Sequence, residues 1–240
     1  MAPRRNPPYL ISPCHLAGPD ATATGSLVMW LLADGWQIGS HEHAIVFSRR
    51  EEGGLLEALQ VRNRTSPVQS TCPASWSWEF TARRAPGVAA AWKVRFAPAT
   101  PPELIATLAT ALTDPAQELS DQGRPHYLSA PLPHEAATRP LDAAGWMRDL
   151  AQDECVWYGP DQQTVVVTPL PPSICGNVGT NWLLAARRAI DDTALWYATA
   201  HPLTPTHLIR ALCTRLADPA PVPRQACPGP EVGNFTVIRP

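Results

Sequence analysis

The sequence predicts an α+β fold that occurs twice: two tandem repeats, each a roughly four-stranded antiparallel sheet with a C-terminal helix packed on one face. Three observations predict it. Residues 78–116 align without a gap to residues 182–220, and 18 of the 39 positions are identical. Short β-like segments separated by turn formers lie in both copies, and an amphipathic helical pattern closes each one. The chain is therefore expected to hold two copies of one domain of about 110 residues.

The first half of each copy is expected to be a short helix and a hairpin. The helices are placed at about residues 26–34 and 142–152. The hairpin strands are 35–38 and 44–48 in copy one, and 155–158 and 164–168 in copy two. Matching Ala44–Phe47 with Thr164–Val167 leaves an insertion of about 16 residues in copy one, within 49–74. In that insertion, Leu55–Leu59 is interpreted as either a helical turn or an added edge strand.

The second half of each copy supplies two further strands. They are residues 76–83 and 90–97 in copy one, and residues 181–187 and 194–201 in copy two. Side chains alternate between the faces of a strand, so Trp76, Trp78 and Phe80 are expected to face the helix. The recurring tryptophans Trp78, Trp92, Trp182 and Trp196 are interpreted as core anchors rather than as a base-stacking platform.

The closing helix has the clearest pattern. Thr100 at the N-cap, Pro101 at the first helical position and Glu103 at the third form a capping-box arrangement. The apolar residues Leu104, Ile105, Leu108, Ala111 and Leu112 fall on one helical face. Copy two repeats the pattern from Thr204 onward, and an Asp-Pro pair ends both helices because the residue before proline avoids the α region.

These elements divide the chain into five parts. They are an N-terminal tail (1–8), repeat 1 (9–116), a linker (117–125), repeat 2 (126–220) and a Pro-rich extended C-terminal tail (221–240).

Copy two carries a family resemblance. Trp157, the turn Gly159-Pro160-Asp161-Gln162, Trp182, Trp196 and the Thr204-Pro205 helix start resemble the SPDY domain, an actinobacterial family of unknown function. The family is typical of streptomycetes, occurs in tandem copies and is named after the short turn. In copy one the turn is assigned to Gly39-Ser40-His41-Glu42. The resemblance implies an actinobacterial (Streptomyces) origin and supplies no activity.

Composition narrows the classes of function. Charged residues make up 17% of the chain and the formal net charge is −2, which argues against a generic nucleic-acid coat or a membrane-surface binder. The longest apolar run, Leu27–Ala33, is far too short to span a bilayer. No apolar segment follows the basic residues near Met1, so a cytoplasmic protein without membrane contact is expected.

Motifs for chemistry are absent from the sequence. No phosphate-binding loop, nucleophile elbow or zinc-protease motif occurs, so we expect no enzymatic activity and no cofactor. His41 and His43 are weak metal candidates, because alternating side chains share one side of an extended segment, but a solvated turn is the preferred interpretation. If an enzyme site lay between the repeats, His201, His207 and Asp191 would be its first candidates.

The sheet face away from the helix, here called the open face, differs between the copies. In copy one it is expected to carry Glu79, Thr81, Arg83, Lys93 and Arg95. The corresponding copy-two residues are Leu183, Ala185, Arg187, Tyr197 and Thr199. A polar sheet face can contact water, whereas an apolar one usually covers something. The copy-two face is therefore expected to pack on copy one, on a second chain or on a partner.

The sequence thus favours a non-enzymatic binding or scaffold protein that engages a protein, self or other, through its sheet faces. The candidate partner-binding residues are Arg83, Lys93, Arg95, Leu183, Arg187 and Tyr197. A nucleic-acid-binding module is the alternative, in which the duplicated Arg83-Arg84 and Arg187-Arg188 pairs contact phosphates. The arginines are more simply expected to lie along the strand ends and pair with nearby carboxylates.

Overall fold

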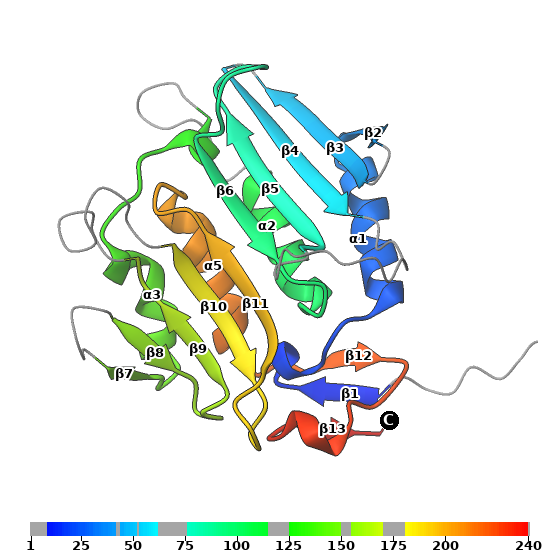
Figure 1. Cartoon of the computed structure of the whole chain (residues 1–240), viewed down its shortest axis with the longest axis vertical. Coiled ribbons are helices and arrows are strands. Elements are labelled where there is room, and N and C mark those ends of the chain that lie inside the picture. The colour runs from blue at the N-terminus through cyan, green and yellow to red at the C-terminus, as the bar shows by residue number, and fades with distance from the viewer. Residues whose placement is uncertain are drawn as a thin grey trace, which may run out of the picture.

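The computed structural model describes residues 9–41, 44–51, 53–61, 76–114, 125–149, 155–169 and 181–239. Ten strands form one antiparallel sheet in the order β2-β3-β4-β5-β6-β11-β10-β9-β8-β7. The helices lie against one face of this sheet, and its other face points toward the viewer in Figure 1. The described part of the chain is therefore α+β, with one five-stranded half-sheet from each copy.

The two copies contain corresponding elements in the same order. Copy one comprises α1 (Ala21–Ala33), β2 (Gln37–His41), β3 (Ala44–Glu51), β4 (Gly54–Val61), β5 (Trp78–Arg83), β6 (Trp92–Phe96) and α2 (Pro102–Leu112). Copy two comprises α3 (His134–Ala143), β7 (Met147–Asp149), β8 (Val156–Tyr158), β9 (Thr164–Val167), β10 (Trp182–Arg187), β11 (Ala194–Ala200) and α5 (Thr206–Ala217). Among the helices of the described residues, none combines the length and apolar character needed to cross a membrane.

The copies meet edge to edge through β6 and β11. Arg95 lies opposite Thr199 in this antiparallel pair. The Ala97 amide donates to the Tyr197 carbonyl (2.9 Å), and the His201 amide donates to the Lys93 carbonyl (2.8 Å). Because Ala97 corresponds to His201 and Lys93 to Tyr197, each hydrogen bond is the counterpart of the other. The copies are thus related by a pseudo-twofold axis at the middle of the sheet.

A single hydrophobic core runs under both halves of the sheet. It includes the four recurring tryptophans, all 2–3% exposed, which confirms that they are core anchors. Leu104, Ile105, Leu108 and Leu112 of α2 pack on the same core, as the apolar stripe predicts. The two copies therefore share one continuous buried apolar surface.

Each copy has five strands rather than the roughly four expected. The insertion of about 16 residues expected in copy one is too long: β4 lies within it and is the counterpart of β9, because both pair with the following long strand. Corresponding positions are 110 residues apart before this region and 104 after it, which leaves six extra residues in copy one. The segment 44–47 therefore matches β8, not β9. Gly35-Trp36 and Gly145-Trp146 fix the correct alignment, in which positions 110 residues apart correspond from α1 to the end of β3.

The prediction of a capping box at the start of the closing helix is also wrong. Helix α2 begins at Pro102, one residue later than expected, and its N-cap Pro101 has no side chain that could cap it. The Thr100 hydroxyl instead donates to the Tyr197 carbonyl across the junction between the copies (3.4 Å). Glu103 accepts two hydrogen bonds from Arg224, at 2.6 and 2.7 Å. Both polar side chains therefore join segments distant in sequence.

Two short helical turns lie on the copy opposite to the one they were assigned to. The Trp92 indole of copy one donates to the Tyr127 carbonyl in η3 (His126–Leu128), at 2.7 Å. The Trp196 indole of copy two donates to the His15 carbonyl in η1 (Cys14–Leu16), also at 2.7 Å. The chain therefore crosses over between the copies, and residues 9–20, which precede copy one, complete copy two.

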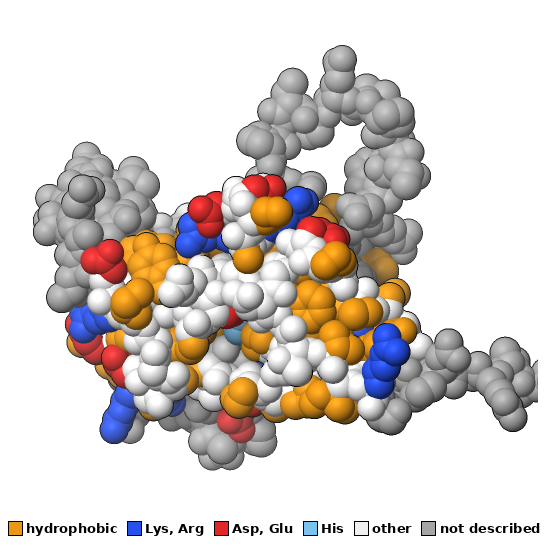
Figure 2. Space-filling view, turned by 90° about the horizontal axis from the view of Figure 1, so that it is seen from below, with side chains coloured by type: hydrophobic (Ala, Val, Ile, Leu, Met, Phe, Trp, Pro, Cys, Tyr) orange, Lys and Arg blue, Asp and Glu red, His pale blue; other side chains and the backbone are white. Residues whose placement is uncertain are grey.

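A second sheet joins the two ends of the described chain. Strand β1 (Tyr9–Ser12) lies between β12 (Val222–Arg224) and β13 (Thr236–Ile238), and the short helix η5 (Pro230–Val232) precedes β13. The C-terminal segment expected to be a tail is thus extended but paired. Seen from this end, hydrophobic and uncharged side chains cover most of the middle of the surface, and charged ones lie mainly toward its edges (Figure 2). The expected tail at 1–8 and most of the linker lie outside the described residues.

Candidate functional site

The open face of the sheet carries the residues that the sequence singled out for partner binding. Strands β5, β6, β10 and β11 are adjacent. Their alternation turns Arg83, Lys93, Arg95, Leu183, Arg187 and Tyr197 away from the buried tryptophans. These six residues therefore share one continuous face around the pseudo-twofold axis. Since both half-sheets lie side by side, the copy-two face does not pack on copy one, and that alternative is wrong.

The copy-one half of the open face is a set of ion pairs between neighbouring strands. Glu79 of β5 accepts a hydrogen bond from Arg95 Nε (2.6 Å), and Lys93 Nζ lies 3.8 Å from the same carboxylate. Glu57 of β4 accepts a hydrogen bond from Arg83 Nε at 2.7 Å. All three predicted cations of this half are therefore neutralised within the sheet, as the carboxylate-pairing interpretation predicts.

Trp76 lies on the open face, against expectation. Its ring makes an edge-to-face contact with Tyr197 (5.2 Å between centroids), and the Arg95 guanidinium lies 5.6 Å from its centroid. Regular alternation would turn it toward the helices, but β5 begins only at Trp78 and the alternation does not extend upstream. Trp76, Tyr197 and Arg95 thus form an aromatic and cationic cluster at the junction of the copies.

The copy-two half of the open face is apolar. Leu183 and Tyr197 are half-buried and Ala185 is 7% exposed, and Val165 and Val167 of β9 share their face. Arg187 stands at the end of β10, where its Nη1 lies 3.6 Å from Asp192. The described residues of this half contain no counterpart of the Glu79 and Glu57 ion pairs. The difference expected from sequence is therefore present in space.

The three residues suggested for an enzyme site do not come together. Asp191 precedes β11 and His201 follows it, so they lie at opposite ends of that strand. His207 lies on α5 on the other side of the sheet, with its ring centroid 5.1 Å from that of His126. Burial, followed by the charges of His126 and Arg210, lowers the pKa of His207 to about 4. No shared reaction centre links the three residues.

The two metal candidates are His41, the last residue of β2, and His43, which precedes β3. The side chain of His41 and all of His43 lie outside the described residues. Among the side chains that are described, no group of three His, Cys, Asp or Glu residues is placed to hold a metal ion.

The turn at 159–162 connects β8 to β9 and is hydrogen-bonded to η1. Asp161 Oδ1 accepts hydrogen bonds from the amides of Gln163 (3.0 Å) and Thr164 (3.1 Å), and His15 Nε2 donates to Oδ2 (2.7 Å). Glu51 occupies the corresponding place in copy one, beside the buried Tyr127, whose pKa is raised by burial and by this carboxylate. The copy-one counterpart of this turn therefore lies where β3 ends and leads into β4, and its assignment to 39–42 is wrong. The corrected 110-residue alignment would have found it.

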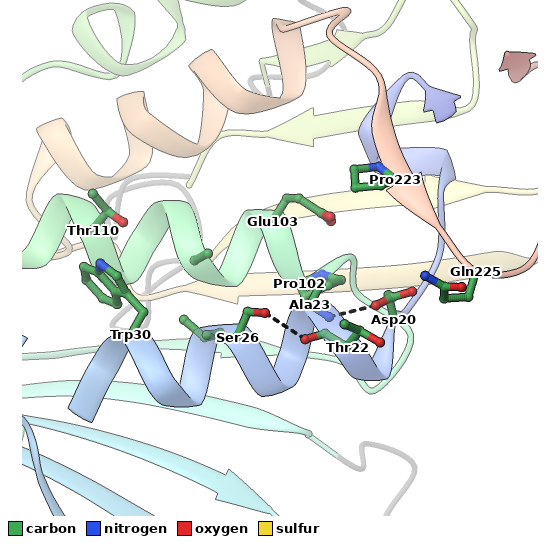
Figure 3. Close-up of a pocket in the computed structure, with 12 residues that line it drawn as sticks. Asp20, Thr22, Ala23, Ser26, Trp30, Pro102, Glu103, Thr110, Pro223 and Gln225 are labelled. Atoms are coloured by element: carbon green, nitrogen blue, oxygen red, sulfur yellow. Dashed lines mark hydrogen bonds between the residues drawn. The ribbon is translucent and has the colours of Figure 1, made fainter. Parts of the chain in front are cut away.

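A groove of about 420 Å³ lies between α1 and α2 (Figure 3). Trp30 and Thr110 lie at one end, and Asp20 and Gln225 lie at the other. In copy two the corresponding helices α3 and α5 pack directly together. Two residues that line the groove differ from their counterparts in copy two: Leu27 corresponds to Ala137, and Ala106 corresponds to Arg210.

Three polar side chains around this groove already have partners. Asp20 Oδ1 caps α1 by accepting from the Ala23 amide (2.7 Å), and the Ser26 hydroxyl donates to the Thr22 carbonyl (3.0 Å). Glu103 is held by Arg224. These three side chains are thus engaged in hydrogen bonds within the fold.

Comparison with known proteins identifies both copies. A family model described as SPDY, domain of unknown function (DUF317), matches residues 59–118 and 160–222. Each match runs from the middle of a half-sheet through its closing helix. No curated protein matches the chain. No solved structure matches it either.

Proposed function

The chain belongs to the SPDY family of domains of unknown function, and on that premise we propose that it is a non-enzymatic binding protein that engages a partner protein through the open face of its sheet. The docking surface is the copy-two half of that face, with Leu183 and Tyr197 at its centre and Arg187 at its margin. The partner is a protein that presents a complementary apolar patch.

The contrast between the two halves carries the proposal. At corresponding positions copy one has Glu79 and Lys93 where copy two has Leu183 and Tyr197. The same fold therefore accommodates charged side chains at these sites, so folding alone does not require the apolar ones. Apolar side chains on a sheet face without a helix layer are typical of an interaction surface.

The alternative of nucleic-acid binding has less support. Arg83, Lys93, Arg95 and Arg187 all lie within 4 Å of a carboxylate oxygen. A phosphate would have to displace these carboxylates, which reduces its gain from each cation. The separation of His201, His207 and Asp191 likewise gives no support to an enzyme site between the repeats.

The test exchanges copy-one residues into copy two. The full chain, immobilised through a tag, is incubated with nuclease-treated lysate of its source organism, and retained proteins are identified and then purified. We expect Leu183→Glu with Tyr197→Lys to weaken direct binding of the purified partner by at least about tenfold, because charges replace the buried apolar contact. Ile190→Glu is the matched control, since Ile190 is exposed and apolar but lies in the β10–β11 turn.

Unchanged affinity in the double variant would overturn the proposal, provided that its circular dichroism and melting temperature match the wild type. Retention that disappears on nuclease treatment, with affinity falling steeply as salt rises, would replace it with the nucleic-acid alternative.

A further inference from the structure

The outer margin of copy one is apolar and exposed. Met29 and Leu32 lie one turn apart on α1, away from the groove residues, and are 66% and 37% exposed. Ile38 of β2 is 59% exposed. It pairs with the buried Phe47, so its side chain projects to the side of the sheet where α1 lies. These three residues are called the α1–β2 patch.

Copy two has charged residues at all three corresponding positions. With Trp36 aligned to Trp146, Met29 corresponds to Arg139, Leu32 to Asp142 and Ile38 to Arg148. The elements that carry these residues are the same helix and the same edge strand. The fold therefore tolerates charges at each site, and the α1–β2 patch is not explained by the stability of the domain.

The edge strand beside the patch is unprotected. β2 is the last strand on its side of the sheet, and no described residue pairs with its outer edge. Its sequence, Gln-Ile-Gly-Ser-His, contains no lysine, acidic residue or proline, which are the usual protection of exposed edges. The opposite edge strand β7 has three residues, two of them the charged Arg148 and Asp149. Only one of the two corresponding edges is thus suited to strand addition.

We propose that the α1–β2 patch and the β2 edge bind a second copy of this chain, by antiparallel β2–β2 pairing across a twofold axis. Such an axis near Gly39 brings Ile38 of one copy opposite Ser40 of the other. No like-charged acidic or lysine side chains meet, because β2 has none. The α1–β2 patches of the two copies then flank the new junction on the same side, where each covers the other's apolar surface.

The middle of the sheet provides a precedent for this geometry. β6 and β11, the other edges of the two half-sheets, pair antiparallel about the pseudo-twofold axis. That junction also has helices on one side only, where α2 packs on α5. The proposed dimer repeats the arrangement at the outer edge and extends one sheet through both chains. A twofold interface needs a self-complementary surface, and an uncharged strand beside an apolar patch satisfies this.

The test measures the molar mass of the full chain by sedimentation equilibrium, from about 1 to about 100 µM. A mass near twice 26.0 kDa is expected at the upper end. The graft Met29→Arg, Leu32→Asp and Ile38→Arg installs the copy-two residues and is expected to give the monomer mass throughout. The control Val88→Arg, Leu132→Asp and Ile190→Arg changes exposed apolar residues elsewhere and is expected to remain dimeric.

A monomeric wild type at all concentrations, or a dimeric graft, would overturn the proposal. If the graft misfolds, amide exchange of the unmodified chain decides: residues 37–41 should exchange at least several-fold more slowly at high than at low concentration. Equal exchange at both concentrations would contradict β2 pairing. Neither readout uses the open face, so the outcome is independent of the proposed function.

Discussion

Asp161 ties together three segments through one carboxylate. Its oxygens accept hydrogen bonds from the amides of Gln163 and Thr164, from the Thr164 hydroxyl (3.1 Å) and from the His15 ring. Burial raises the pKa of Asp161, but the hydrogen bond and charge of His15 and the two amides outweigh it and hold that pKa below its ordinary 3.8. An acid whose pKa is lower in the folded state stabilises the fold above its unfolded pKa.

Replacement of Asp161 by alanine should therefore lower the free energy of unfolding by about 2 kcal/mol at pH 7, because buried donors lose their acceptor. The loss should shrink as the pH falls below about 4, where the wild-type carboxylate is protonated in the unfolded chain. Urea titrations at pH 7 and pH 3.5 measure both. Asp142→Ala, at an exposed position of α3, should cost less than about 0.5 kcal/mol. Equal losses at the two pH values would refute the proposed linkage.

At the scale of elements, the contact between α5 and η3 places two histidine rings together. His207 Nε2 is buried, and its hydrogen-bond partner is not found among the described residues. The pKa of about 4 means that the unfolded chain binds a proton more readily than the folded chain between pH 6.5 and pH 4. Stability should therefore fall as the pH drops through this window, and be unaffected by His207 above it.

The variant His207→Phe keeps a ring against His126 but cannot titrate. Between pH 6.5 and pH 4 the free energy of unfolding falls in both proteins. We expect the fall to be smaller in the variant than in the wild type, by up to about 3 kcal/mol. Thermal unfolding across this range, with equal melting temperatures at pH 7.5 as the control, checks it. Parallel pH profiles would show that His207 is not the titrating group.

An element could be predicted from the sequence when the pattern that determines it lies within its own segment, and not when a contact with a distant segment determines it. The long strands β5 and β10 and the closing helices follow from side-chain alternation and an apolar stripe, which lie within the segment. β4 was expected only as one of two alternatives for Leu55–Leu59, and then as an edge strand. Its place inside the sheet was missed because the short runs around it match two different strands of copy two, and register is set by pairing across the sheet. The capping box failed because Glu103 binds Arg224, 121 residues away. The open-face contrast needed only the ungapped repeat, whereas the position of Trp76 depends on where a strand begins.

At the scale of the whole molecule, the crossover of residues 9–20 makes copy two depend on the start of the chain. Ser12 donates to the Pro219 carbonyl (2.7 Å), and Arg224, which is 2% exposed, donates to the carbonyls of Ala17 and Gly18 (3.1 Å each). No pattern in the sequence indicates this, because the hydrogen bonds of η1 to other elements are with residues 146 to 201 positions later.

Loosening this crossover should affect copy two before copy one. Trp196→Phe removes the donor to the His15 carbonyl and keeps most of the ring volume. We expect amide exchange to accelerate in β11 and α5, and in residues 9–20, while β3 and β4 stay protected. Hydrogen exchange with mass spectrometry of the full chain measures this, with Trp92→Phe as the matched control, for which α2 and η3 should respond instead. Acceleration confined to copy one in Trp196→Phe would contradict the crossover.

The antiparallel pairing of β6 with β11 also affects how far the sequences of the two copies can diverge. Two separate single-copy chains joined in this way would need to find each other at a rate set by their concentration. In one polypeptide the linker keeps the halves at a high effective concentration, so β6 and β11 pair even when the protein itself is dilute. Neither half then has to remain identical to the other for association. One half is free to keep a water-compatible surface while the other specialises, as the pairs Glu79 and Leu183, and Arg139 and Met29, have done.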